Sequence, residues 1–247
     1  MAVHYTKMTI ITRRDKYPDL TDALLGLNIE GMTATEVTGN GTQIGQIQYK
    51  GSDGRTEILL IPKIYVELVT TAGKVASILK TILPVLQTGI VGDGKIFLEN
   101  IEGEVYTISS GTHAQEEDED SRESEEFVMS AAAKPMTKVT IVTRKEKMKE
   151  LRKELVAIGV SGMTVTNVEG CGRQHGVTKF VEGISRHSGL LPKIKVEIVV
   201  CSVPVSAVIE TAQKVLGTGS MGDGKIFTSP ISHAIRVRTG ETDDAAI

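Results

Sequence analysis

A glycine-rich motif that could hold a phosphate occurs twice in the sequence. Its two occurrences consist of Gly92, Asp93, Gly94 and Lys95, and of Gly222, Asp223, Gly224 and Lys225. Clustered glycines let successive backbone N–H groups point at one anion, and the lysine adds a positive charge. Each motif ends a GxxxxGK run, but isoleucine follows where a P-loop has Ser or Thr at the start of a helix. The motif therefore predicts an anion-binding turn that enters a strand, with a plain tight turn as the alternative.

Two arginines near residue 240 strengthen the case for a phosphate ligand. Arg236 and Arg238 are two residues apart in AIRVRTG, so a strand would direct both side chains to one face. Two guanidinium groups on one face repel each other unless an anion or a carboxylate lies between them. Arginine also binds phosphate oxygens through two N–H groups at once. The alternative is a solvated pair on an exposed strand.

A long polar stretch, residues 172–190, opens with the sequence GRQHG. Its flanking glycines predict a loop that can change conformation with a ligand. Gln174 offers an amide to a metal ion or a carboxylate, and Lys193 adds a positive charge where the next strand begins. Without the other motifs this segment would be interpreted as a long hairpin loop.

The sequence offers no pattern of catalytic residues. No nucleophile stands beside a base, and the five histidines are scattered along the chain. Cys171 and Cys201 are thirty residues apart, which matches neither a CxxC pair nor a metal-binding spacing. We therefore expect no catalytic residues and two reduced thiols.

One pattern is written twice along the chain. Residues 7–41 match 138–172, residues 61–69 match 191–199, and residues 88–97 match 218–227. A repeat that preserves order and spacing predicts two homologous domains. We assign copy one to residues 6–112, with a degenerate ligand site, and copy two to residues 136–247, with an intact one.

The segment between the copies, residues 113–135, is predicted to be a flexible acidic linker. Residues 116–126 carry a net charge of −7, which leaves +4 for the rest of a chain whose total is −3. Such an acidic block stays solvated, and a mild positive excess suits small anions better than nucleic acid. No apolar run approaches the length of a membrane span, and the N-terminal residues lack the pattern of an export signal. We expect a cytoplasmic protein without direct membrane insertion.

Hydrophobic patterns within each copy alternate between strand and helix. In copy two, residues 145–159 carry apolar side chains at helical spacing, namely Met148, Leu151, Leu155 and Ile158. Strand patterns cover 139–144, 163–170, 193–200, 225–227 and 234–239, and a second helix pattern covers 203–217. This order predicts an α+β fold of two ferredoxin-like βαββαβ domains in tandem, each with its helices on one face of an antiparallel sheet. The other face needs cover, so we expect oligomerisation.

Taken together, these motifs resemble the nitrogen regulatory P-II family. Copy two carries GMTVT, GCGRQHG, LPKIKVEIVV, TGSMGDGKIF and RVRTGETDDAAI, and copy one retains GMTAT, IPKIYVEL and TGIVGDGKIF. The family implies a trimer of ferredoxin-like domains with ATP or ADP in clefts between subunits. It also implies that 2-oxoglutarate joins Mg²⁺-ATP and that the long loop then changes its contact with a target protein.

The resemblance assigns the nucleotide site to copy two, with the turn and the arginines around the phosphates and strand residues around the base. The implied nucleotide-binding residues are Thr164, Gly172, Arg173, Gln174, Glu197, Val199, Gly222, Asp223, Gly224, Lys225, Arg236 and Arg238. Gln174 and Lys193 would bind 2-oxoglutarate, and Gln174 would also serve the Mg²⁺ of Mg²⁺-ATP.

Copy one departs from the family where phosphate would bind. Its arginine positions are Thr42, Tyr106 and Ile108, and each lost charge-assisted contact is worth roughly 1.5–3 kcal/mol. We therefore expect little effect of Lys95→Ala on ATP binding. The degenerate site of copy one would consist of Gln43, Lys63, Gly92, Asp93, Gly94 and Lys95. In copy two, Ile184 and Arg186 replace the serine and tyrosine that are modified in other family members, so covalent control there is not expected.

The resemblance predicts a non-catalytic regulator of nitrogen metabolism that binds ATP or ADP, with or without 2-oxoglutarate and Mg²⁺. It would control a target enzyme or transporter through its long loop. The alternative is a P-II-like module that regulates carbon or bicarbonate uptake and binds AMP or bicarbonate. Three-domain rings built from two-domain chains predict a homotrimer with two rings, each made of like copies.

Overall fold

The structure is a computed structural model of the chain. It describes residues 4–27, 29, 31–41, 48–50, 56–58, 60–103, 105, 134–170, 190–219 and 222–247. All but the last two residues of the expected acidic linker therefore lie outside the described residues, as do residues 172–189 of the expected loop.

Both copies have the predicted order of strands and helices. Copy one contains β1 (Tyr5–Arg13), α1 (Tyr17–Gly26), β2 (Met32–Asn40), β3 (Gln48–Lys50), β4 (Thr56–Ile58), β5 (Ile61–Thr71), α2 (Val75–Leu86) and β6 (Gly94–Ile101). Copy two contains β7 (Met136–Thr143), α3 (Met148–Ala157), β8 (Met163–Gly170), β9 (Leu191–Val200), α4 (Val205–Leu216), β10 (Gly224–Ile231) and β11 (His233–Arg236). The βαββαβ prediction is confirmed, and the short β3–β4 hairpin is an addition that the sequence patterns did not indicate.

Each copy buries a hydrophobic core between its two helices and one face of its strands. Leu151 and Leu155 of α3 are fully buried against Val139 and Ile141 of β7, as the helical spacing predicted. In copy one, Met8 and Ile10 of β1 take the same place. Since side chains alternate along a strand, the residues between these apolar ones point away from the helices. That second face is where the functional residues lie.

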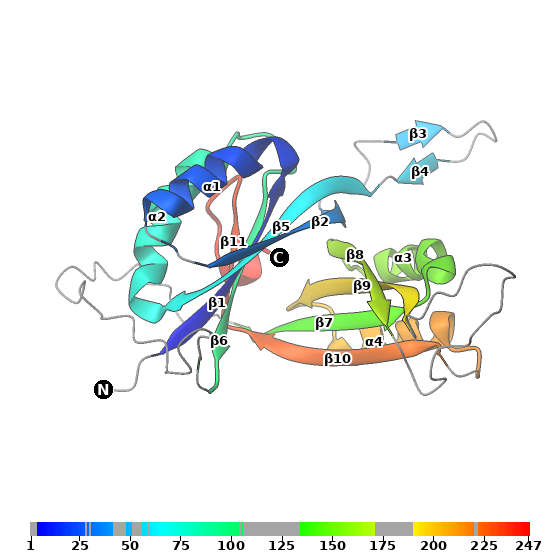
Figure 1. The fold of residues 1–247 in the computed structure, drawn as a ribbon. Helices are drawn as coiled ribbons and strands as arrows, with labels where there is room; N and C mark the ends of the chain where they lie inside the picture. Colours follow the sequence, from blue (N-terminus) through cyan, green and yellow to red (C-terminus); the bar gives the residue numbers. More distant parts are fainter. Residues whose placement is uncertain are drawn as a thin grey trace, which may run out of the picture.

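One continuous sheet of nine strands joins the copies, in the order β10-β7-β9-β8-β2-β5-β1-β6-β11. At its centre β2 pairs with β8, where Gly39 lies opposite Thr164. The helices cover the outer sides of the two halves, and the strands of the halves face each other between them (Figure 1). The cover that we expected from other chains is thus partly supplied by the second copy of the same chain.

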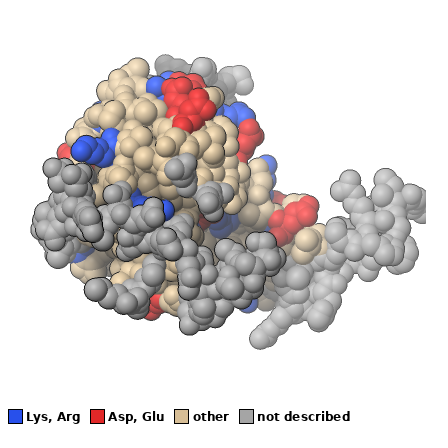
Figure 2. All heavy atoms as spheres, turned by 60° about the vertical axis from the view of Figure 1, so that its left-hand side comes forward, with Lys and Arg blue, Asp and Glu red and all other residues tan. Residues whose placement is uncertain are grey.

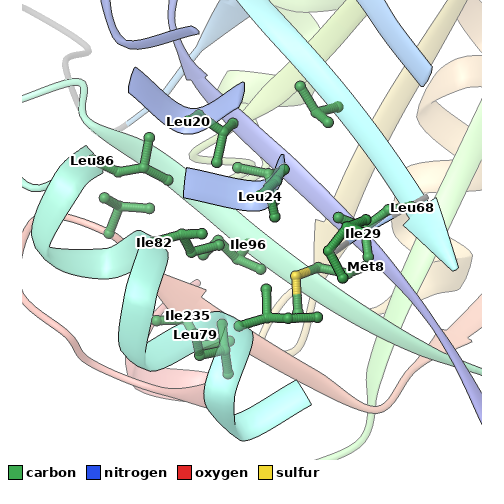
Figure 3. Packing of buried hydrophobic residues seen from close by; sticks show 14 of the residues in the cluster. Met8, Leu20, Leu24, Ile29, Leu68, Leu79, Ile82, Leu86, Ile96 and Ile235 are labelled. Carbon is green, nitrogen blue, oxygen red and sulfur yellow. The ribbon is translucent and has the colours of Figure 1, made fainter. Parts of the chain in front are cut away.

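The last strand crosses from copy two into copy one. The sequence patterns placed residues 234–239 in copy two, but β11 pairs with β6 and lies in the half formed by copy one (Figure 1). Ile235 and Val237 are part of the copy-one core, where Ile235 lies beside Leu79 of α2 (Figure 3). Contact between the two copies decides this placement, which local periodicity cannot show.

A third apolar cluster lies between the copies. It contains Phe97 from β6, Met136 from β7, Ile231 at the end of β10 and Ala234 from β11. On the face drawn in Figure 2, acidic and basic side chains of the described residues are interspersed on a mostly uncharged surface. No helix in the described part of the chain is long and apolar enough to cross a membrane.

Candidate functional site

A cleft lies between the helix-free faces of the two copies. Copy one lines it with Thr9, Ile11, Gly39, Gly41, Lys63, Tyr65, Val91, Gly92, Asp93, Gly94, Lys95, Phe97 and Glu99. Copy two lines it with Lys138, Ser161, Gly162, Met163, Thr164, Glu197, Val199, Arg236 and Arg238. The glycine-rich turn of copy one therefore shares a cleft with the two arginines of copy two.

The turn of copy one is held in place by its own aspartate. The Asp93 carboxylate accepts hydrogen bonds from the backbone N–H of Thr88 at 2.8 Å and of Gly89 at 3.0 Å, and from the Thr88 hydroxyl. Gly94 has φ +117°, and a Cβ there would lie 1.8 Å from the carbonyl oxygen of Ile11. The aspartate thus shapes the turn, and the glycine lets it press against β1.

The turn of copy two has the same internal construction. Asp223 accepts hydrogen bonds from the Thr218 backbone N–H at 2.7 Å and the Thr218 hydroxyl at 2.6 Å. These bonds, with the nearby Arg144 guanidinium, lower the pKa of Asp223 to about 2. Gly224 has φ +135° and lies against the carbonyl oxygen of Val142. Sequence reasoning assigned both aspartates to ligand binding, and the structure gives their carboxylates contacts within the turns.

Two lysines of copy one face the cleft with little solvent around them. Burial and the positive charge of Arg236 lower the pKa of Lys95 to about 8, and its Nζ donates to a main-chain oxygen of Ile247, the last residue of the sequence, at 3.1 Å. Burial also lowers the pKa of Lys63, whose Nζ donates to the carbonyl oxygen of Gly92. Neither ammonium group has an Asp or Glu side chain within ion-pair distance among the described residues. An anion in the cleft would stabilise their charged forms.

The two arginines reach this cleft from the end of β11. The strand ends at Arg236 and Arg238 lies in the following turn, so the expectation that both sit on one strand is wrong, although both line the cleft. Arg236 donates through Nη1 to the Glu241 carboxylate at 2.5 Å. Its Nε is buried and has no hydrogen-bond partner among the described residues. This guanidinium therefore keeps a donor for a further acceptor.

Acidic and aromatic side chains also line the cleft. Glu197 of β9 is paired with Lys195, whose Nζ is 3.1 Å from the carboxylate and 5.4 Å from the ring centre of Tyr65. Burial raises the pKa of Tyr65, as do the nearby charges of Glu197 and Glu67. Thr164 and Val199 complete this part of the lining. The lining of the cleft thus combines a glycine turn and basic side chains with an aromatic ring and the Glu197 carboxylate.

Some of the nucleotide-binding residues expected in copy two line this cleft, and others do not. Thr164, Glu197, Val199, Arg236 and Arg238 line the cleft. The residues from Gly222 to Lys225 form a separate turn, where Lys193 Nζ donates to the carbonyl oxygen of Gly222 at 2.8 Å. Cleft residues that the sequence did not single out, such as Tyr65, Glu99, Lys138 and Ser161, acquire their role from the contact between the copies.

Several expected ligand residues cannot be placed. Gly172, Arg173, Gln174, Gln43, Tyr106 and Ile108 all lie outside the described residues. Within the described residues no group of three His, Cys, Asp or Glu side chains could hold a metal ion. The Mg²⁺ and 2-oxoglutarate assignments that rest on Gln174 therefore stay predictions.

Comparison with known proteins gives the family. The family model "Nitrogen regulatory protein P-II" matches twice, at residues 5–112 and 136–241. The nitrogen regulatory PII-like protein of Bacillus subtilis (strain 168) is 48% identical over 112 residues, which are 45% of this chain and 97% of that protein. The P-II protein of Klebsiella oxytoca is 43% identical over 112 residues, 45% of this chain and all of that protein.

Solved structures of similar chains cover about half of this one. The structure of B. subtilis GlnK has 48% sequence identity and a TM-score of 0.39, and covers 46% of this chain and 99% of its own. The B. subtilis GlnK–ATP complex has 45% identity and the same TM-score, and covers 46% and 96%. Since the family model matches both halves of the sequence, this chain belongs to the nitrogen regulatory P-II family and contains two P-II domains in tandem.

Proposed function

We propose that this chain is a non-catalytic, cytoplasmic signal-transduction regulator of nitrogen metabolism that binds ATP or ADP in the cleft between its two copies. Lys63 and Lys95 from copy one and Arg236 and Arg238 from copy two line one cleft beside a glycine-rich turn. That convergence is the observation that carries the proposal. Binding would be transmitted to a target enzyme or transporter through residues 172–190.

The chemistry of the cleft supports a polyphosphate ligand. Burial lowers the pKa values of Lys63 and Lys95, and the charge of Arg236 lowers that of Lys95 further. A di- or triphosphate supplies several acceptor oxygens that arginine can bind in pairs and lysine can bind as a point charge. The nucleoside would then contact Thr164, Glu197 and Val199, which line the same cleft.

This location changes the role expected for Lys95. The resemblance alone assigned the nucleotide to the copy-two turn, and Lys95→Ala was expected to have little effect. Inside one chain, however, the arginines of copy two share their cleft with Lys95 and not with Lys225. We therefore propose one high-affinity nucleotide per chain, between the copies. Binding of 2-oxoglutarate and Mg²⁺ through Gln174 and Lys193 remains a further part of the proposal.

Titration calorimetry of the full chain with ATP, ADP, AMP and bicarbonate, each with and without Mg²⁺ and 2-oxoglutarate, tests the function. We expect ATP and ADP to bind at one site per chain, because the cleft offers one complete set of phosphate-binding side chains. A response to AMP or bicarbonate alone would favour the alternative, a P-II-like module of carbon or bicarbonate uptake. Absence of nucleotide binding would contradict the proposal.

Self-association is also part of the proposal, since trimers are typical of this family. Three chains of 26.6 kDa give a mass of about 80 kDa by light scattering. A monomeric mass would leave the cleft between the copies intact but would contradict self-association.

A further inference from the structure

We propose that the outer edge of β6 is built to receive β11 and that the equivalent edge of β10 is not, so that the copies pair as unlike partners and the cleft is completed within one chain. The pairing specificity rests on contacts between the copies. Only its consequence for the site rests on the proposed function.

Backbone hydrogen bonds give the first evidence. The pairing begins where Ser232 N–H donates to the carbonyl oxygen of Leu98 at 2.9 Å and the N–H of Asn100 donates to the Ser232 hydroxyl at 3.2 Å. The N–H of Asn100 therefore points to the outer edge of β6. In copy two the matching residue is Pro230, which has no N–H and is typical of a strand edge that takes no partner.

A buried ion pair between the copies gives the second line of evidence. Lys138 of β7 places its Nζ 2.6 and 2.7 Å from the two oxygens of Glu99 on β6, and the side chains are only 12% and 14% exposed. The copy-two residue that matches Glu99 is Ser229. A contact between two copies of copy two would leave the Lys138 ammonium opposite a hydroxyl group. Desolvation of an unpaired charge disfavours that arrangement.

Side chains of copy one that contact residues 235–238 give the third line of evidence. Gln87 Nε2 donates to the carbonyl oxygen of Arg238 at 2.5 Å, next to the cleft, and the matching residue in copy two is Gly217. Ile82 of α2 belongs to the core that encloses Ile235, and the matching residue on α4 is Ala212. Both differences remove from copy two the side chains that hold the segment in copy one.

Within one chain, the two strands also differ in burial. Phe97 on β6 is 9% exposed, whereas its counterpart Phe227 on β10 is 55% exposed. β10 ends the sheet on one side, and β11 has been added beyond β6 on the other. The same KIF sequence is thus a covered strand in one copy and an open edge in the other.

Unlike pairing has a consequence for assembly. Each chain has one β11, and a strand that pairs with β6 of its own chain cannot serve a copy-two domain of another chain. Rings made only of like copies, as the family resemblance led us to expect, would require β11 to leave β6. The phosphate-binding turn and the arginines would instead come from the same chain, so nucleotide binding would not depend on exchange between chains.

Mixed chains test this consequence. Lys95→Ala and Arg236→Ala/Arg238→Ala chains with different tags are unfolded, refolded together, isolated through both tags and titrated with ADP. Because neither chain holds a complete site, we expect the mixture to bind no better than either variant alone. Recovery of about a quarter of the sites, as random exchange of arginines between chains would give, would overturn the proposal. If Lys95→Ala alone binds as the unaltered chain does, the proposed site has failed, and the pairing is judged by the next experiment.

Hydrogen exchange tests the pairing without a ligand. In Gln87→Gly/Glu99→Ser/Asn100→Pro, which gives copy one the residues that copy two has at these three positions, we expect amides 233–237 to exchange at least about tenfold faster. Ser229→Ala is the matched control and should leave them protected. Asn100→Pro alone serves if the triple variant unfolds, because the outward N–H of Asn100 makes no bond to β1. Unchanged protection in a folded variant would overturn the proposal.

Discussion

The turns Gly92–Lys95 and Gly222–Lys225 have the same sequence, and in each the aspartate accepts hydrogen bonds from the preceding threonine, but their surroundings differ. Lys95 faces the arginines of copy two, whereas Lys225 is exposed. An aspartate bonded to the preceding Thr-Gly segment and a glycine pressed against a strand build the turn in each copy. Local sequence therefore makes the turn, and the neighbouring copy decides whether it becomes part of a ligand site.

The largest effect on stability is expected at Gly94, the glycine of the turn that Gly224 matches in copy two. Gly94→Ala would place a methyl group 1.8 Å from the Ile11 carbonyl in a backbone conformation of positive φ. We expect a loss of roughly 3–5 kcal/mol in the free energy of unfolding, measured by urea denaturation. Gly89→Ala is the control, because Gly89 also has positive φ but open space around it, and should cost about 1 kcal/mol. Equal losses would show that the close approach to β1 is unimportant.

The next largest effect is expected from the ion pair Lys138–Glu99, because copy two has Ser229 where copy one has Glu99. Glu99→Ser leaves a largely buried ammonium without its carboxylate, and we expect a loss of about 3 kcal/mol in the free energy of unfolding. Glu99→Lys combined with Lys138→Glu should recover much of it, since the exchanged pair restores opposite charges in the same place. Denaturation of the singles and the double gives the coupling energy. A coupling near zero would mean that this pair does not hold the copies together.

Measuring nucleotide affinity in variants of Lys95 and Lys225 compares the two turns directly. Lys95→Ala removes a charge-assisted contact and should weaken ADP binding by roughly 10- to 100-fold, which corresponds to about 1.5–3 kcal/mol. Lys225→Ala is the matched variant and should change the affinity less than about twofold. Calorimetry on the full chain measures both. The reverse order would move the site to the copy-two turn, as the family resemblance alone suggested.

Sequence patterns predicted the fold well because its determinants are local. The helical spacing of Leu151 and Leu155 and the strand at 163–170 depend on neighbours in the chain, and both were confirmed. The crossing of β11 was missed, because the patterns of residues 234–239 are equally compatible with either copy. Its placement depends on Pro230, Glu99 and Gln87, whose meaning appears only when the copies are set side by side.

The sequence singled out the glycine turn and the two arginines as candidate phosphate-binding groups, and phosphate binding stays a prediction. The structure brings the copy-one turn and both arginines into one cleft. Assigning all of them to copy two followed from the completeness of its motifs. A site shared between copies takes its groups from both, and the degenerate motif of copy one concerns Tyr106 and Ile108, which the cleft does not need if Arg236 and Arg238 replace them.

The smallest expected effect is a pH dependence that should distinguish Lys95 from Lys225. In the free chain, burial and Arg236 hold the pKa of Lys95 near 8, so its charged fraction falls as the pH rises from 7.5 to 9. A bound polyphosphate favours the charged form and raises this pKa, so binding takes up a proton and must weaken with rising pH. We expect roughly a tenfold loss of ADP affinity at pH 9, about 1.4 kcal/mol for one pH unit above that pKa.

Phosphate ionisation does not explain such a loss, because the last phosphate proton leaves near pH 6. Calorimetry in two buffers of different ionisation enthalpy would detect the proton uptake directly. Lys95→Arg provides the control, since arginine stays charged throughout this range and should bind ADP with the same affinity at pH 7.5 and 9. Lys225→Arg should keep the pH dependence of the unaltered chain. A flat profile in the unaltered chain, or one that only Lys225→Arg removes, would mean that the ammonium group meeting the phosphates belongs to the other turn.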